Sequence, residues 1–228
     1  MEKNEFHKTS HMCSKNGARL LSEAQALEFE RPPSTKHFLS MIAQEEFAKA
    51  FLLHLVGVEV IPWNSNILRA AKDHKCKQLL CIVMDYLNLD TESFIKRFKG
   101  PNPFKFPPKV LDAINILCYE KIGRWESDKW QWADDPQWDT EAMKVAEGKL
   151  DIIKQDSLYV KIGKNGSGIC TPEHVTEKRA NEEYDRARRF EFFLDRLFHD
   201  DKDPNVDYRE VVNIFKRLFT QEASEERT

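Results

Sequence analysis

The sequence predicts an all-α protein, an antiparallel helical bundle with a small β-ribbon inserted late in the chain. Three observations predict it. Apolar residues recur at helical spacing along most of the 228 residues. Proline and glycine breaks, such as Arg31-Pro32-Pro33 and Gly100-Pro101, separate the periodic segments. Strand-like alternation occurs late, at 157–162, and is followed by a glycine-rich turn at 163–168.

The first hundred residues contain four predicted helices. They are expected at 18–27, from a cap at Ser34 or Thr35 to about Gly57, from Asn64 or Ser65 to about Leu87, and at 91–99. The first must end before Pro32-Pro33, because two prolines cannot continue a helix. The last meets the break at Gly100-Pro101.

The second half continues the helical pattern around one irregular segment and one ribbon. Helices are expected from Pro107-Pro108, at 140–155, at 176–198 and in a final amphipathic segment ending near Phe219. We treat 1–228 as a single domain, with a core bundle at 12–130, a Trp-rich irregular segment at 125–138, a β-ribbon at 157–171 and C-terminal helices at 174–219.

The composition is that of an ordinary soluble protein. Hydrophobic residues make up 41% and charged residues 32%, and the net charge is −3. No apolar run approaches the roughly 18 residues of a membrane helix, and the first residues lack the apolar core of a signal peptide. We therefore expect a cytoplasmic protein without membrane contact.

The cysteines predict neither a disulfide framework nor a zinc knuckle. Five of them are scattered along the chain without a Cys-x-x-Cys pair. The composition thus gives no indication of a bound metal, and we predict no cofactor.

The helix at 37–57 is unusual because it places charge within an apolar stripe. At helical spacing, Glu46 and Lys49 share a face with Leu39, Ile42 and Leu53. Burying an unpaired charge is costly, so a polar pocket shared with another helix is expected. The helix at 64–87 can supply its polar groups.

Several motifs together resemble the AbiV family of bacterial abortive-infection proteins. They are 18–27, 42–50, 74–77, 157–160 and Thr171-Pro172. One departure is that Lys161 stands where the family usually has an acid after Leu-Tyr-Val. AbiV proteins are similar to the broader HEPN class of helical bundles. The resemblance implies antiphage defence in which the infected cell halts its own translation.

Many HEPN proteins are metal-independent ribonucleases with an Arg followed four to six residues later by a His. Two pairs here fit that spacing, Arg69 with His74 and Arg31 with His37. Arg31 precedes two prolines in a loop, so we treat its match as accidental. A His can act as general acid or base on a ribose 2′-hydroxyl, and an Arg can hold the phosphate.

The first hypothesis is therefore a homodimeric ribonuclease that cleaves cellular RNA. His74 is its general acid or base and Arg69 its phosphate ligand. The residues expected to organise the site are Glu45, Glu46, Lys49 and Lys77. Five positions on a regular helix rotate a side chain by about 140°, so Arg69 and His74 converge only at a frayed helix start or across a dimer.

The second hypothesis is a non-catalytic helical switch that blocks translation by binding a ribosomal or phage partner. A phage-encoded protein would activate it. Trp130, Trp132, Arg186 and Arg189 are the residues predicted to contact the partner or RNA.

Two structural alternatives exist for His74. It could bond Glu46 and, with Lys49, lock the second and third helices together. Glu45, Glu46 and His74 could also hold a metal, but no Glu-x-x-His partner follows, so no metal is predicted.

Overall fold

The computed structural model describes residues 3–87, 113, 142, 144–145 and 147–199, and the statements below concern those residues. The helices predicted at 91–99 and from 107 on, the Trp-rich segment at 125–138 and the final amphipathic segment lie outside them. Most of what is described is helical, as predicted, and a two-stranded sheet occurs late in the chain.

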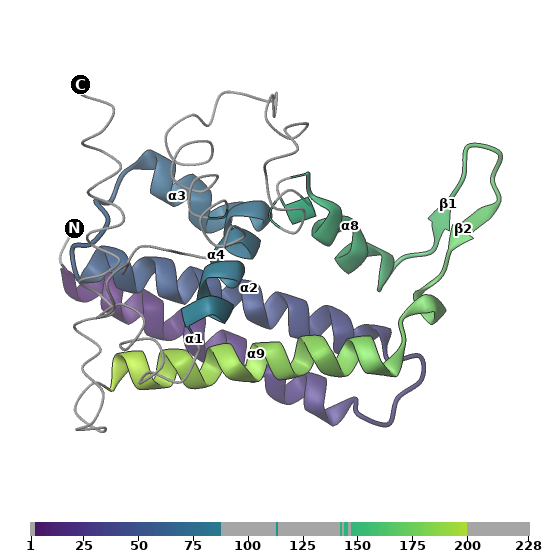
Figure 1. Cartoon of the computed structure of the whole chain (residues 1–228), viewed down its shortest axis with the longest axis horizontal. Coiled ribbons are helices and arrows are strands. Elements are labelled where there is room, and N and C mark those ends of the chain that lie inside the picture. Colours follow the sequence, from purple (N-terminus) through teal and green to yellow (C-terminus); the bar gives the residue numbers. More distant parts are fainter. Residues whose placement is uncertain (1–2, 88–112, 114–141, 143, 146, 200–228) are drawn as a thin grey trace, which may run out of the picture.

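Three long helices form the body of the fold (Figure 1). They are α1 (Lys3–Ala26), α2 (Ser34–Gly57) and α9 (Glu177–Phe198), and each contacts the other two. The chain runs one way along α1 and returns along α2, and α9 runs in the same direction as α2. The predicted extents of α2 and α9 are confirmed. The predicted cap of α2 at Ser34 or Thr35 is wrong, because the cap position is Pro33 and no side chain makes a capping hydrogen bond there. Thr176 caps α9 by accepting a hydrogen bond from the Arg179 backbone N–H at 3.3 Å.

Helix α1 is longer than the predicted helix at 18–27. Its first half is polar in sequence, yet Phe6, Ser10 and Cys13 are buried at helical spacing. The Ser10 hydroxyl donates to the Ala50 carbonyl of α2 at 2.7 Å. Contact with α2 therefore stabilises a segment whose own apolar pattern is weak.

The helix predicted from 64 to 87 is two helices, α3 (Ser65–Lys72) and α4 (His74–Leu87). Asp73 separates them with an extended backbone, φ −79° and ψ 127°. Its carboxylate accepts the Cys76 backbone N–H at 2.8 Å. An Asp that caps a new helix competes with continuation of the old one, and this is the physical reason for the break.

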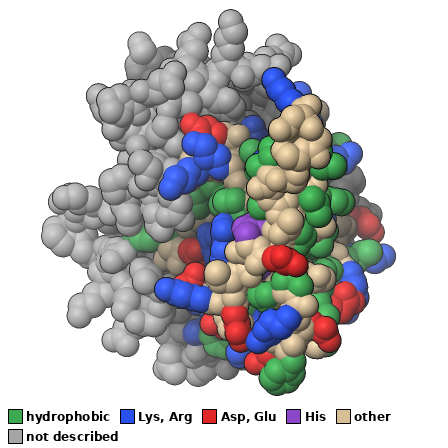
Figure 2. Space-filling view, turned by 90° about the vertical axis from the view of Figure 1, so that its right-hand side faces the viewer, with side chains coloured by type: hydrophobic (Ala, Val, Ile, Leu, Met, Phe, Trp, Pro, Cys, Tyr) green, Lys and Arg blue, Asp and Glu red, His purple; other side chains and the backbone are tan. Residues whose placement is uncertain are grey.

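The late segment contains a short helix and the predicted ribbon. The helix predicted at 140–155 is interrupted at Gly148, whose backbone is left-handed with φ 79°, and α8 (Lys149–Asp156) begins after it. Helix α8 leads to β1 (Lys161–Ile162), which pairs antiparallel with β2 (Gly168–Cys170). The strands are shorter than predicted because 157–159 forms the turn that ends α8. A 3₁₀ turn, η2 (Pro172–His174), connects the ribbon to α9. The ribbon projects beyond the bundle, and hydrophobic side chains gather on the surface at this end (Figures 1 and 2).

The hydrophobic core surrounds α2, which is covered by α1, α4 and α9. Phe47, Phe51, Leu52 and Leu55 of α2 are almost completely buried. Phe47 packs so closely on α1 that a Cβ at Gly17 would lie 2.6 Å from its ring. In the part of the chain that the structure describes, no helix combines the length and apolar character needed to cross a membrane.

Candidate functional site: a charged network around Glu45

A buried carboxylate, Glu45, lies at the centre of a charged network between α2, α4 and α8. Its side chain is 3% exposed. Lys77 donates to Oε2 at 3.0 Å, Lys154 to Oε1 at 2.7 Å and Gln78 to Oε1 at 3.2 Å. His74 Nδ1 lies 2.5 Å from Oε2. Nearly every acceptor position of this carboxylate is thus used.

Burial alone would raise the pKa of Glu45. The positive charges of Lys77 and Lys154, with hydrogen bonds from Lys154 and His74, outweigh burial and hold the pKa below its ordinary value. Glu45 is therefore ionised at neutral pH, and the fold depends on keeping its partners in place.

Local helix geometry brings these partners together. His74, Lys77 and Gln78 are spaced i, i+3 and i+4 at the start of α4, so they share the face turned to α2. Lys154 of α8 is buried, with 5% of its side chain exposed, and it also contacts Asp151 Oδ1 at 2.7 Å. This lysine thus lies between two carboxylates.

His74 is the network member that reaches the surface, since half of its side chain is exposed. Nδ1 faces Glu45 at 2.5 Å and the Lys154 ammonium at 3.1 Å. We assign a proton to Nδ1, because the shorter contact is to a carboxylate, which can only accept. In the neutral imidazole with this tautomer, Nε2 carries the lone pair and can accept a proton from a ligand.

A metal is a poor fit to this site. Glu45, His74 and Asp151 each offer a donor atom within 4.8 Å of the others. The Lys154 ammonium, however, already contacts both carboxylates, and Lys77 contacts Glu45. Two fixed positive charges would repel a cation here, so the donor set suits a hydrogen-bonded ion cluster.

Glu46 does not join the network. It accepts from Asn16 Nδ2 of α1 at 3.1 Å and forms an ion pair with Lys49. The predicted lock between His74, Glu46 and Lys49 is therefore corrected, since the carboxylate that binds His74 is Glu45. The metal set of Glu45, Glu46 and His74 is not assembled either. Neighbouring helical residues point about 100° apart, which separates the two carboxylates.

The family model described as HEPN, AbiV matches residues 5–191. The chain belongs to the AbiV family. The predicted resemblance is thus confirmed, and the family indicates an abortive-infection function of the HEPN type. No curated protein and no solved structure matches the chain significantly.

In this AbiV protein, Arg69 and His74 lie on different helices. Arg69 is exposed on α3, and His74 begins α4 after the break at Asp73. The side chains of Arg69 and His74 are therefore not held at the rotation of about 140° that one regular helix would impose.

The other Arg and His pair is not a site. Arg31 pairs with Glu177 at 3.1 Å, whereas His37 is buried and bonds Ser157 Oγ at 2.8 Å. Burial, followed by the charges of Arg179 and His174, lowers the pKa of His37 to about 4.

Two predicted contact residues of the AbiV protein, Arg186 and Arg189, both bind Asp85 of α4. Arg186 Nε lies 2.5 Å from Oδ2, and Arg189 Nη2 lies 3.1 Å from Oδ1. The Arg186 side chain is only 16% exposed, so this residue is internal and does not fit the predicted contact surface. Arg189 remains half exposed. Trp130 and Trp132 lie outside the described residues.

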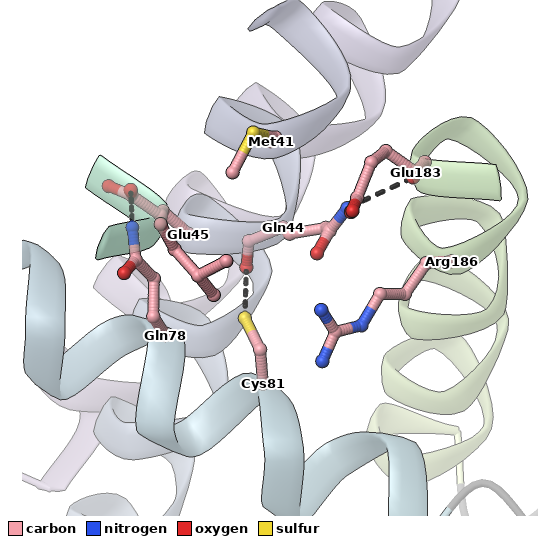
Figure 3. Close-up of a pocket in the computed structure, with 8 residues that line it drawn as sticks. Met41, Gln44, Glu45, Gln78, Cys81, Glu183 and Arg186 are labelled. Atoms are coloured by element: carbon pink, nitrogen blue, oxygen red, sulfur yellow. Dashed lines mark hydrogen bonds between the residues drawn. The ribbon is translucent and has the colours of Figure 1, made fainter. Parts of the chain in front are cut away.

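Arg186 also lines a small pocket of about 20 Å³ between α2, α4 and α9 (Figure 3). Gln44 crosses one side of it and donates to Glu183 Oε2 at 2.8 Å, and Cys81 Sγ lies 3.6 Å from the Gln44 carbonyl. The pocket has room for about one water molecule.

Sequence reasoning missed Lys154, Asp151 and Gln78. Lys154 and Asp151 lie in a segment that reads as an ordinary charged helix. The i, i+3 spacing of Asp151 and Lys154 only weakly indicates an ion pair. Nothing in the neighbouring sequence indicates that Lys154 is buried. Gln78 lies four residues after His74 and therefore on the same helical face, and this spacing was the signal that could have predicted it as a site residue.

Proposed function

We propose that this AbiV protein acts in abortive infection as a metal-independent endoribonuclease that stops translation in the infected cell. One observation carries the proposal. His74 is half exposed, and its Nδ1 is held by the buried carboxylate of Glu45. A histidine held through one nitrogen by a carboxylate presents its other nitrogen for proton transfer.

The reaction uses groups that this chain has. His74 Nε2 takes the proton from a ribose 2′-hydroxyl, whose oxygen attacks the neighbouring phosphorus and displaces the 5′-oxygen. The products are a 2′,3′-cyclic phosphate and a 5′-hydroxyl, and the proton from the imidazolium returns to the leaving oxygen. Glu45 stabilises the imidazolium during the reaction.

Arg69 is proposed to hold the phosphate. It is exposed on α3, the helix that immediately precedes His74. A guanidinium offers several donors to phosphate oxygens and can offset their developing charge. A homodimer is proposed to bring the Arg69 of one copy toward the His74 of the other, which removes the requirement that both converge within one chain.

The test is incubation of purified protein with total bacterial RNA and tRNA in EDTA, followed by mapping of new ends. Wild type should cleave, whereas His74→Ala, Glu45→Gln and Arg69→Ala should lose activity. His199→Ala is a matched control, because His199 is also part-exposed, 43%, and pairs with Asp195 at 3.1 Å. Loss of cleavage in His199→Ala, or full cleavage by His74→Ala, would contradict the proposal.

A second candidate is a non-catalytic switch that blocks translation by binding a ribosomal or phage partner. The observation that favours it is the pairing of Glu45 with four side chains from two helices. Such a network can serve only to hold α2, α4 and α8 together, without any catalytic role. Here wild type and His74→Ala would arrest growth equally without producing new RNA ends. Growth arrest in cells, measured beside RNA cleavage, separates the two candidates.

A further inference from the structure

The β1–β2 ribbon and the turn before it expose an unusual concentration of large apolar side chains. Ten such residues are exposed in the described part of the chain, and five of them lie within 158–169. They are Leu158, Tyr159, Val160, Ile162 and Ile169. Single exposed apolar residues are ordinary, but a cluster of this kind marks an interaction site.

The backbone of the ribbon adds a second feature. The described sheet has only these two strands, so each has one outer edge without a neighbouring strand in it. Two-stranded ribbons are marginally stable in water, and open edges are templates for a further strand. This ribbon also stands away from the bundle, where an added strand meets little obstruction from the three long helices (Figure 1).

Charge distinguishes between possible partners. Residues 157–172 include Lys161 and Lys164 and no Asp or Glu. Two acids flank this stretch, Asp156, whose Oδ1 lies 4.0 Å from Lys161 Nζ, and Glu173, so the positive charge is confined to the ribbon itself. A second copy would bring its own lysines to the same edge, and like charges across paired strands repel. An acidic partner is attracted instead.

We propose that the β1–β2 ribbon is a docking surface for an extended segment of another protein in which apolar and acidic side chains alternate. The segment adds as a third strand. Beside β1 its side chains alternate between two faces, apolar on the face of Ile162 and acidic on the face of Lys161. Lys164 lies in the turn at the end of this edge and adds positive charge there. Main-chain hydrogen bonds supply affinity, and the alternating side chains supply specificity. This surface is separate from the His74 site and does not depend on RNA cleavage.

The test uses two fluorescein-labelled peptides, one alternating Val and Glu and one alternating Val and Lys. Fluorescence anisotropy should show that wild type binds the acidic peptide at least tenfold more tightly than the basic one. The double variant Ile162→Ser, Ile169→Ser should weaken that binding at least tenfold. Phe192→Ser is the matched control, since Phe192 of α9 is 59% exposed and lies outside the ribbon, and it should bind as wild type does.

A charge reversal sharpens the test. Lys161→Glu with Lys164→Glu should shift the preference toward the basic peptide, and circular dichroism should show an unchanged helical content. Equal binding of the two peptides, or equal loss in Phe192→Ser, overturns the proposal. So does a ribbon-dependent dimer in sedimentation equilibrium, or ribbon-dependent pelleting with phosphatidylserine vesicles, because each assigns the surface to another occupant.

Discussion

Glu45 and Glu46 are neighbours in sequence, but their side chains point about 100° apart on α2 and lie in different environments. Glu45 faces α4 and α8, is 3% exposed and binds two lysines, a glutamine and a histidine. Glu46 faces α1, is 15% exposed and binds Asn16 and Lys49. The same side chain thus forms the centre of a buried network at one position and a part-exposed ion pair at the next. Burial and the number of partners decide how much each contributes to stability.

The largest expected difference comes from removing each carboxylate. Glu45→Ala should lower the free energy of unfolding by about 3 to 5 kcal/mol, because Lys77 and Lys154 would be left buried without their shared partner. Glu46→Ala should cost about 1 kcal/mol or less. Urea unfolding followed by circular dichroism measures both. Equal losses would mean that the two environments are energetically alike.

Removing a lysine partner of each glutamate should again cost more stability at the Glu45 network than at Glu46, but the difference should be smaller. Lys154→Ala should cost about 2 kcal/mol, less than loss of Glu45, because Lys77 and His74 remain on the carboxylate. Lys49→Ala, the matched change beside Glu46, should cost roughly 0.2 to 1 kcal/mol. The same unfolding assay applies. A Lys154→Ala variant as stable as wild type would show that the remaining partners of Glu45 compensate for the lost lysine.

The pH dependence of stability should reveal the buried carboxylate of Glu45. The folded-state pKa of Glu45 lies below the ordinary 4.5, so its carboxylate stabilises the fold above about pH 4.5. That contribution is lost as the pH falls through the lowered value, by about 1.4 kcal/mol per unit of lowering. The stability difference between wild type and Glu45→Gln should therefore shrink toward low pH. Glu46→Gln is the control, and a Glu45→Gln difference that stays constant down to pH 3 would refute the assignment.

Two buried histidines, His37 and His54, also change the stability of the fold with pH in that experiment. Burial lowers the pKa of His37 and of His54 from 6.5 to about 4, with further lowering by Arg179 and His174 for the first and by His7 and His11 for the second. The contribution of these two histidines to the free energy of unfolding is fully present above pH 6.5. It declines as the pH falls toward 4, because the histidines of the unfolded chain bind protons at a higher pH than those of the folded chain. This decline should occur equally in all three proteins and cancel in the differences.

The last prediction concerns the helix break that positions His74. Asp73→Ala removes the cap on α4 and should cost about 1 kcal/mol. Asn64→Ala removes the corresponding cap on α3, where Asn64 Oδ1 accepts the Ile67 N–H at 3.0 Å, and should cost a similar amount. If the break matters for the site, only Asp73→Ala should also reduce RNA cleavage. Equal cleavage by the two variants would assign Asp73 a purely structural role.

Much of the fold follows from local sequence signals. Ser34 and Gly57 bound α2 as the breaks around them predict, and Thr176 begins α9 by its own capping bond. The late ribbon follows from alternation and a glycine turn. The missed features have other causes, one tertiary and one local. The first half of α1 depends on packing against α2, and Asp73 divides a helix whose apolar periodicity continues on both sides.

The sequence by itself determined an all-helical protein with a late ribbon, membership of the AbiV family, and charge placed inside the second helix next to a histidine-bearing segment. These are properties of neighbouring residues or of ordered motifs. Only the tertiary structure decided that Glu45 rather than Glu46 binds His74, and that Lys154 completes the network. His74 lies 29 residues from Glu45 and Lys154 lies 109 residues away. Contacts over such separations are set by how helices pack, because packing selects which of two adjacent side chains turns toward the partner.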